Sequence, residues 1–216
     1  MKTLPLIIFI LCCCFNTQAQ EATSNSNVFI FETFTEGKAL LKNKAINQTK
    51  FNYDCVKQEL HFLSDGENMI MDDNSNIDTL YIGNRKFIPY QNRFLEYIPI
   101  NNAALLIDYK TKVLPIGKKG AYGVTTQGTA PVLDFDPSKP LDQKSLDNHV
   151  YRFNLENKYY LEQDQKRKKF TNTKSFLKLF PKEHAEAISS FMKKEKINMQ
   201  NPGDVMKAVE FATKGN

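Results

Sequence analysis

The stretch Tyr81-Ile-Gly-Asn-Arg-Lys-Phe-Ile-Pro-Tyr-Gln-Asn-Arg-Phe-Leu-Glu-Tyr-Ile98 decides the fold of this 216-residue chain. Gly83-Asn84 is a pair of residues that accepts positive φ in a tight hairpin, and Gln91-Asn92 turns the chain a second time. The segments around the two turns are rich in Ile, Phe and Tyr, which suit pleated strands. Pro89 cannot donate to a strand ladder, so it belongs at a strand end or a sheet edge. The stretch therefore predicts three antiparallel strands joined by tight turns.

Short apolar segments alternate with turn residues from Val28 to Leu114. The candidate strands in this part are 28–33, 38–42, 49–53, 57–63, 69–71, 79–82, 85–90, 94–99 and 103–114. In the fourth of them Leu60 and Phe62 alternate with His61, which predicts His61 at an exposed edge or surface. Consecutive hairpins of this size are expected to curl into a small barrel or a curled sheet.

The chain changes character after residue 114. Residues 115–149 are rich in Gly, Pro and Thr and lack periodicity, so we expect a loop or linker there. Residues 150–216 are expected to form one short hairpin and a small helical region. The overall pattern predicts an α+β fold, in which an antiparallel β domain at residues 28–114 precedes these C-terminal helices.

Three helix starts are expected near the C-terminus. Thr173 can cap a first helix, and Pro181 is suited to the first helical position of a second. Asn201 and Pro202 form a cap and an N1 residue for the last helix.

The N-terminal twenty residues have the order of a secretory signal peptide. Met1-Lys2 is a positive head, residues 4–15 are an apolar run, and Thr17-Gln-Ala19 offers small residues for cleavage. The apolar run is shorter than the ~20 residues that span a bilayer. We expect residues 1–19 to be removed, residues 20–27 to be a disordered leader, and the mature chain to have no transmembrane helix. The signal indicates export to the periplasm or cell envelope.

Three of the four cysteines, Cys12, Cys13 and Cys14, lie inside the apolar run. None follows the Leu-small-small triplet of a lipidated cysteine, so we expect all three to leave with the signal, with lipid anchoring at the outer membrane as the alternative. Cys55 then remains alone, which excludes an internal disulfide. A thiol without a partner is expected to be a small apolar filler beside a strand. The three histidines lie far apart in sequence, so neither a metal nor a cofactor is expected.

No sequence motif in the chain indicates a particular type of reaction. Gly117-Lys-Lys-Gly120 has the form of a nucleic-acid clamp, but it follows a strand and a proline where that clamp needs two helices. The carboxylates at residues 72–78 lack the glycine and glutamate that a calcium loop requires. The basic stretches 166–169 and 193–196 suit a solvated face, and export argues against DNA, so no nucleic-acid partner is expected.

One loop is the candidate surface for a partner. Lys118, Lys119 and Tyr122 combine charge with an aromatic ring on a flexible backbone. The net charge of +5 permits contact with another envelope protein or with an anionic surface.

Three stretches carry a resemblance to known sequences: residues 81–89, Gly117-Lys-Lys-Gly-Ala-Tyr-Gly123, and Phe176-Leu-Lys-Leu-Phe-Pro181 before a helix. Together they resemble a group of exported cell-envelope proteins common in Bacteroidota. The resemblance implies an envelope setting and no particular activity or site.

The function expected from the sequence is that of a non-enzymatic binding or assembly module in the periplasm or at the outer membrane. The alternative is an exported hydrolase whose carboxylates meet only in the fold. A pocket holding two carboxylates roughly 5–9 Å apart would mark that alternative.

The signal peptide generates the first prediction. Expression of the full chain in a secreting host should yield a mature protein whose intact mass corresponds to a start at Gln20. Mass spectrometry of the purified envelope and soluble fractions measures this directly. An acyl mass on Cys12, Cys13 or Cys14 would contradict cleavage after Ala19 and establish lipid anchoring.

Overall fold

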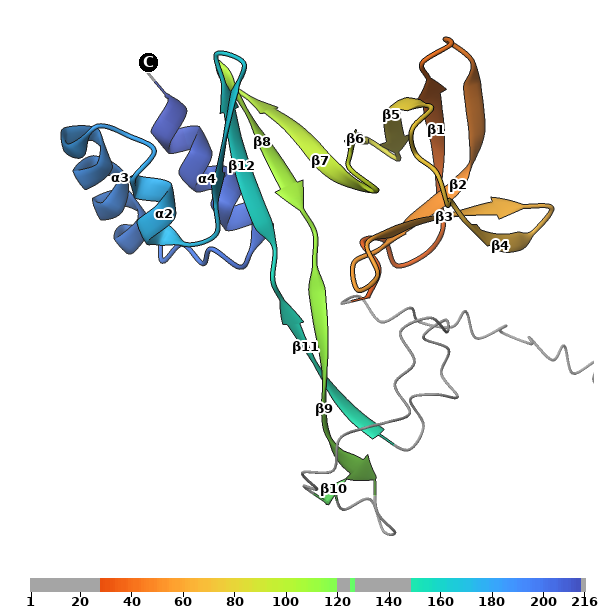
Figure 1. The fold of residues 1–216 in the computed structure, drawn as a ribbon. Coiled ribbons are helices and arrows are strands. Elements are labelled where there is room, and N and C mark those ends of the chain that lie inside the picture. The colour runs from red at the N-terminus through yellow and green to blue at the C-terminus, as the bar shows by residue number, and fades with distance from the viewer. Residues whose placement is uncertain (1–27, 120–124, 127–148, 215–216) are drawn as a thin grey trace, which may run out of the picture.

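The computed structural model describes residues 28–119, 125–126 and 149–214 as an antiparallel β-sheet with three helices at its C-terminal end (Figure 1). The ten-stranded sheet has the order β13-β12-β8-β7-β6-β5-β1-β2-β3-β4. Its strands are β1 (Thr35–Leu41), β2 (Ile46–Asp54), β3 (Glu59–Ser64), β4 (Glu67–Ile70), β5 (Ile77–Ile82), β6 (Arg85–Tyr90), β7 (Arg93–Ile100), β8 (Ala103–Asp108), β12 (Lys158–Gln163) and β13 (Lys166–Phe170).

A second, three-stranded sheet projects from the first. It consists of β9 (Thr111–Lys119), β10 (Thr125–Thr126) and β11 (His149–Leu155), with β9 in the centre. The β9–β11 pair continues the line of β8 and β12 away from the large sheet (Figure 1). The first residues of the expected linker 115–149 therefore belong to β9, and residues 127–148 lie outside the described residues. The expected segments 28–114 and 150–216 share one sheet, because β12 pairs with β8.

The sequence predicts most strands but not all. The stretch 81–98 forms β5, β6 and β7, with Gly83 at φ +57° in the first turn. The pairing of β6 with β5 ends at Phe87, so Pro89 lies at a strand end as predicted. The expected strand 28–33 is wrong, because it makes only one isolated bridge, from Phe29. The expected strand 103–114 is two strands, β8 and β9.

The large sheet is curled and open, which decides between the two expected shapes. Its edge strands, β13 and β4, are at opposite ends of the order and do not pair with each other. The curl brings the turn after β2 to the ends of β7 and β8, where Gln58 donates to Asp108 at 2.7 Å. Asn74 likewise donates to the carbonyl of Arg93 at 3.2 Å. The α+β class is confirmed.

Cross-strand partners define an inner row that crosses seven strands. Residues directly opposite in an antiparallel ladder share one face of the sheet. The row runs Ala39–Leu80–Phe87–Glu96–Ile107–Tyr159–Phe170, and every member is buried. One end of this face holds the core enclosed by β1–β6, and the other end holds the core beneath the helices. Tyr109 packs against both cores.

The three helices cover the β12–β13 end of the inner face (Figure 1). They are α2 (Thr173–Leu177), α3 (Lys182–Lys194) and α4 (Pro202–Thr213). Asn201 caps α4 and Pro202 begins it, as predicted. The other two starts differ by one residue: Asn172, not Thr173, caps α2, and Pro181 precedes α3. None of the described helices is long and apolar enough to cross a bilayer.

Ile188, Met192, Val205 and Val209 form the buried stripes of α3 and α4. Their spacing of four residues places each pair on one side of its helix. The stripes pack with Leu105, Ile107 and Phe170 of the sheet, so the helices are held by apolar burial.

Gly37 generates the prediction of this section. A Cβ on Gly37 would overlap the carbonyl oxygen of Tyr81 and lie 2.8 Å from the Phe51 ring. Gly37→Ala should therefore lower the free energy of unfolding by about 2 kcal/mol or more, because neither backbone nor ring can move away freely. Urea unfolding measures the change. Glu36→Ala, at the exposed neighbouring residue, is the control and should change it by less than about 0.5 kcal/mol. Equal stability of the two variants would show that β1 is not closely packed there.

Candidate functional site

Glu96 is the only charged member of the buried inner row, and it is held by Arg85. The Nε of Arg85 donates to Glu96 Oε1 at 2.6 Å, and an Nη of Arg85 donates to Oε2 at 2.7 Å. The Tyr109 hydroxyl donates to Oε2 at 2.7 Å and accepts from Arg85 at 2.9 Å. The guanidinium also lies over the rings of Phe31 and Phe87. The group is a neutral, closed arrangement between the two cores.

A second arginine–carboxylate pair lies next to the first along the chain. Arg93 donates through Nε and an Nη to the two oxygens of Asp108, at 3.1 and 3.0 Å. Asp108 is fully buried, and Gln58 donates to it and to the carbonyl of Tyr109. Asp108 and Tyr109 are consecutive residues. The end of β8 is therefore held by one pair through Asp108 and by the other through Tyr109.

Burial and ion pairing have opposite effects on the pKa of Arg85. Burial alone would lower the pKa of Arg85, but the hydrogen bonds and charge of Glu96, with Tyr109, raise it above the ordinary value. Burial, followed by the charge of Glu96, raises the pKa of Tyr109. Both groups therefore keep their protons at neutral pH, and Tyr109 remains a donor to Glu96.

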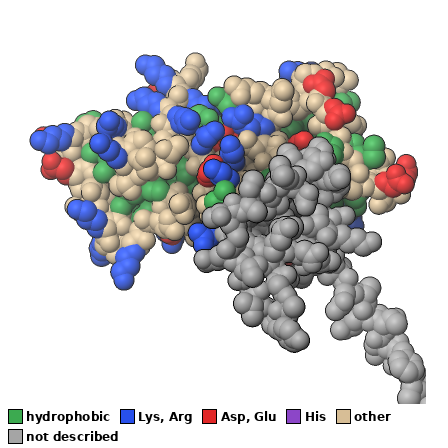
Figure 2. All heavy atoms as spheres, turned by 60° about the horizontal axis from the view of Figure 1, so that its bottom comes forward, with side chains coloured by type: hydrophobic (Ala, Val, Ile, Leu, Met, Phe, Trp, Pro, Cys, Tyr) green, Lys and Arg blue, Asp and Glu red, His purple; other side chains and the backbone are tan. Residues whose placement is uncertain are grey.

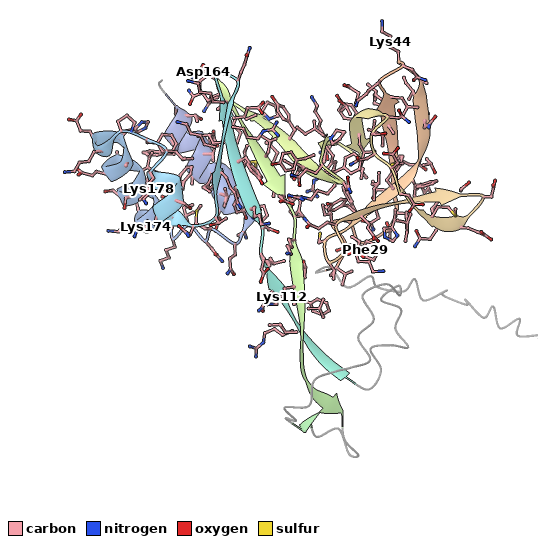
Figure 3. All side chains as sticks on the ribbon, viewed as in Figure 1. Phe29, Lys44, Lys112, Asp164, Lys174 and Lys178 are labelled. Atoms are coloured by element: carbon pink, nitrogen blue, oxygen red, sulfur yellow. The ribbon has the colours of Figure 1, made fainter. Side chains whose placement is uncertain are left out.

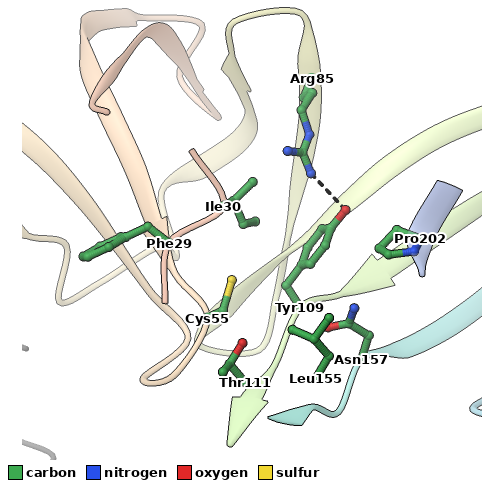
Figure 4. Close-up of a pocket in the computed structure, with 9 residues that line it drawn as sticks. All are labelled: Phe29, Ile30, Cys55, Arg85, Tyr109, Thr111, Leu155, Asn157 and Pro202. Carbon is green, nitrogen blue, oxygen red and sulfur yellow. Dashed lines mark hydrogen bonds between the residues drawn. The ribbon is translucent and has the colours of Figure 1, made fainter. Parts of the chain in front are cut away.

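A cavity of about 170 Å³ opens beside this cluster, between the two cores (Figure 4). Its lining comes from the N-terminal segment, the strands and the start of α4: Phe29, Ile30, Cys55, Arg85, Tyr109, Thr111, Leu155, Asn157 and Pro202. The polar groups among them are mainly hydrogen-bond donors, and no carboxylate is part of the lining. A pocket between two cores is a common position for a small-ligand site.

The polar groups of the pocket can bind a ligand but are not activated for attack. Burial, followed by the charge of Asp54, raises the pKa of the Cys55 thiol to about 12, so the thiol is protonated at neutral pH. Arg85 uses Nε and one Nη on Glu96 and Tyr109, and its other Nη makes no hydrogen bond to any described residue. Figure 4 shows the thiol of Cys55 and the hydroxyl of Thr111 near the Tyr109 ring.

The predicted partner-binding loop lies largely outside the described residues. Lys118 and Lys119 belong to the backbone of β9, but their side chains lie outside the described part of the chain. Tyr122 and Cys12–Cys14 also lie outside it. The loop remains a prediction. Cys55 is buried directly after β2, as expected for a small filler.

The prediction that His61 lies at an edge or surface is wrong. His61 is 6% exposed, because β3 is paired on both sides, with β2 and with β4. Its Nδ1 lies 3.1 Å from Asn68 Oδ1. The Phe29 ring packs against the imidazole in an edge-to-face arrangement, with 5.5 Å between the two ring centres. Its Nε2 lies 4.0 Å from Glu59 Oε2. Across the described ranges, no group of three His, Cys, Asp or Glu side chains is placed to hold a metal ion.

The pattern analysis of the sequence does not identify Arg85, Glu96, Arg93 or Asp108. A signal for them exists: each is a charged residue within or next to a strongly apolar strand, as in Phe94-Leu-Glu-Tyr-Ile98. A charge on the buried side of a strand must be paired in the fold. Its partner comes from another strand, and sequence spacing does not specify which one.

Comparison with known proteins returned no relatives. No family model matches the chain, and neither a curated protein nor a solved structure is significantly similar to it.

The burial of Cys55 generates the next prediction. At pH 8 a thiol with a pKa of about 12 is protonated, so Ellman's reagent should label native Cys55 much more slowly than the same protein in urea. The absorbance of the released thiolate measures both rates. Fast labelling of the folded protein at pH 8 would show an activated thiol and make Cys55 a candidate nucleophile.

Proposed function

We propose that this chain is an exported, non-enzymatic binding module of the periplasm or the outer membrane, and that the pocket beside Arg85 holds its ligand. The observation that carries the proposal is the chemistry of the pocket lining. Its polar groups can donate hydrogen bonds, its thiol, on Cys55, is protonated, and no carboxylate that could activate the Thr111 hydroxyl is part of the lining. Such a lining suits retention of a ligand better than its conversion.

The form of the ligand follows from the mixed lining of the pocket. Arg85 and Thr111 offer donors, whereas Phe29, Leu155 and Pro202 are apolar. Pro202 is the first residue of α4, so the positive end of the helix dipole points to the same region. A cavity of about 170 Å³ takes a small molecule only. We therefore infer a short monocarboxylate or a similar acceptor with a small apolar tail.

The alternative, an exported hydrolase, requires two carboxylates in one pocket. Glu96, which is bonded to the lining residues Arg85 and Tyr109, has both oxygens engaged by Arg85 and one also by Tyr109. Asp108 is engaged in the same manner by Arg93 and Gln58. Neither is placed to protonate a leaving group or activate water, which supports binding over hydrolysis.

Small-ligand binding is tested by thermal stability. Monocarboxylates from propionate to benzoate serve as probes, and a probe at about a hundred times its Kd should raise Tm by roughly 5–10 °C. Leu155→Trp should abolish the shift, because the indole fills the pocket from a partly exposed position. Ile46→Trp adds the same side chain at an exposed residue that does not line the pocket, and should leave the shift unchanged.

Two results would contradict the proposal. One is the absence of a Tm shift with every probe, or a shift that persists in Leu155→Trp. The other is hydrolysis of the corresponding methyl esters that Glu96→Gln abolishes, because this would assign catalysis to the cluster and support the hydrolase.

A further inference from the structure

The outer face of the sheet carries a second row of cross-strand partners, one residue away from the inner row. Successive residues of a strand point to opposite faces, so the partners of the next residues form one line. The row crosses seven strands and runs Lys38–Tyr81–Lys86–Tyr97–Leu106–Tyr160–Lys169. It begins and ends with exposed lysines, and lysines and tyrosines make up all but one of its members. Leu106 and Tyr160 are buried in a small apolar cluster, so the accessible part of the row consists of its three lysines with Tyr81 and Tyr97.

The lysines of this outer row are not neutralised. No carboxylate of the described residues forms an ion pair with Lys38, Lys86 or Lys169. Two carboxylates that share the face are engaged by arginines, Glu162 by Arg167 and Asp108 by Arg93. A third, Glu36, lies two residues from Lys38 on β1 and forms its ion pair with Lys50, at 3.8 Å. The outer row is therefore a line of excess positive charge. In the view of Figure 2, acidic side chains gather at the β1–β4 end, and basic side chains lie over the middle and the helical end.

Two of the three tyrosine rings of the outer row, Tyr81 and Tyr97, are covered by cations. The ammonium of Lys38 lies 5.2 Å from the centre of the Tyr81 ring, and that of Lys86 lies 4.7 Å from the centre of Tyr97. Tyr90, which packs beside Tyr160, has the guanidiniums of both Arg93 and Arg167 over its ring. Sequence-tolerant binding of single-stranded nucleic acid needs open ring faces on which bases stack. These rings instead hold the cations in place.

The shape of the sheet limits what can contact the whole outer row. The row spans six strand-to-strand steps of ~4.8 Å, or about 29 Å along the sheet. Neighbouring strands rotate by roughly 20–25° per step, so Lys38 and Lys169 point in widely different directions. A flat surface such as a lipid bilayer cannot contact both ends at once. A flexible linear chain can follow the row around the curved face.

We propose that the outer row, Lys38 to Lys169, binds a linear acidic polysaccharide laid across the strands. Its carboxylate, sulfate or phosphate groups pair with the lysines, and its sugar hydroxyls bond to the hydroxyls of Tyr81 and Tyr97. Neither interaction requires a free ring face. The proposal is independent of the pocket beside Arg85, since the two sites are on opposite faces of the sheet.

The test uses alginate oligosaccharide, a polyuronate, as the probe for the full mature chain. Lys38→Gln/Lys86→Gln/Lys169→Gln should weaken alginate binding roughly tenfold or more at low salt and make the fall of log affinity with log salt less steep. The matched control is Lys174→Gln/Lys178→Gln/Lys193→Gln, which removes the same charge from exposed residues of the helical layer. Figure 3 shows Lys174 and Lys178 on that layer. The control should bind as the wild type does, and circular dichroism melts confirm that both variants fold.

Three outcomes would overturn the proposal. The first is a wild-type chain that does not bind alginate at low salt, and the second is an equal loss of binding in both triple variants. The third is a preference for another probe: tighter binding of oligothymidylate would indicate nucleic acid, and tighter binding of phosphatidylglycerol vesicles would indicate a lipid surface. Failure here leaves the monocarboxylate shift of the pocket unaffected, so the two proposals are tested separately.

Discussion

The arginine–carboxylate pairs at the end of β8 are the interaction on which the rest of the structure depends. Arg85 with Glu96 and Tyr109 joins the two cores on the inner face, and Arg93 with Asp108 ties the curl of the sheet to the same point. Removal of one partner from a buried ion pair commonly lowers the free energy of unfolding by about 3–5 kcal/mol, because the remaining charge is buried without a partner. The ladders from β5 to β8 already connect the two cores through one sheet, and the pairs add side-chain bonds at that connection.

The pocket is a consequence of how that junction is built. A guanidinium bonded on two sides to Glu96 and Tyr109 is wide and polar, and the apolar residues of the two cores cannot close completely around it. The space that remains is lined by the edge of Arg85 and by side chains of both halves, from Phe29 at one end of the described chain to Pro202 near the other. The position of the pocket thus follows from a structural requirement, and its donor-rich chemistry follows from the arginine.

The sequence predicts local structure here far better than it predicts the site. The Gly83-Asn84 turn, the stretch 81–98 and the Asn201-Pro202 helix start depend on neighbours in the chain, and they are correct. The curl that buries His61, and the pairing of Arg85 with Glu96, depend on strand order, which local patterns do not contain. Local patterns also do not contain the break at Tyr109 between β8 and β9, because this break lies where one residue contacts both cores. The alternation of charge and apolar residues could identify Glu96 as a buried acid, but not its partner.

Register connects the inner pair to the outer row. Arg85 and Lys86 are consecutive on β6, as Glu96 and Tyr97 are on β7, so the same pairing places one set inward and the other outward. A slip of one residue would turn Lys86 into the core and Phe87 to solvent, and it would separate Arg85 from Glu96. Because the bidentate pair forms only in the correct register, it also fixes the line of lysines and tyrosines on the opposite face. The outer surface therefore depends on a buried interaction that no ligand on that surface touches, and a change at Glu96 would alter both faces of the sheet together.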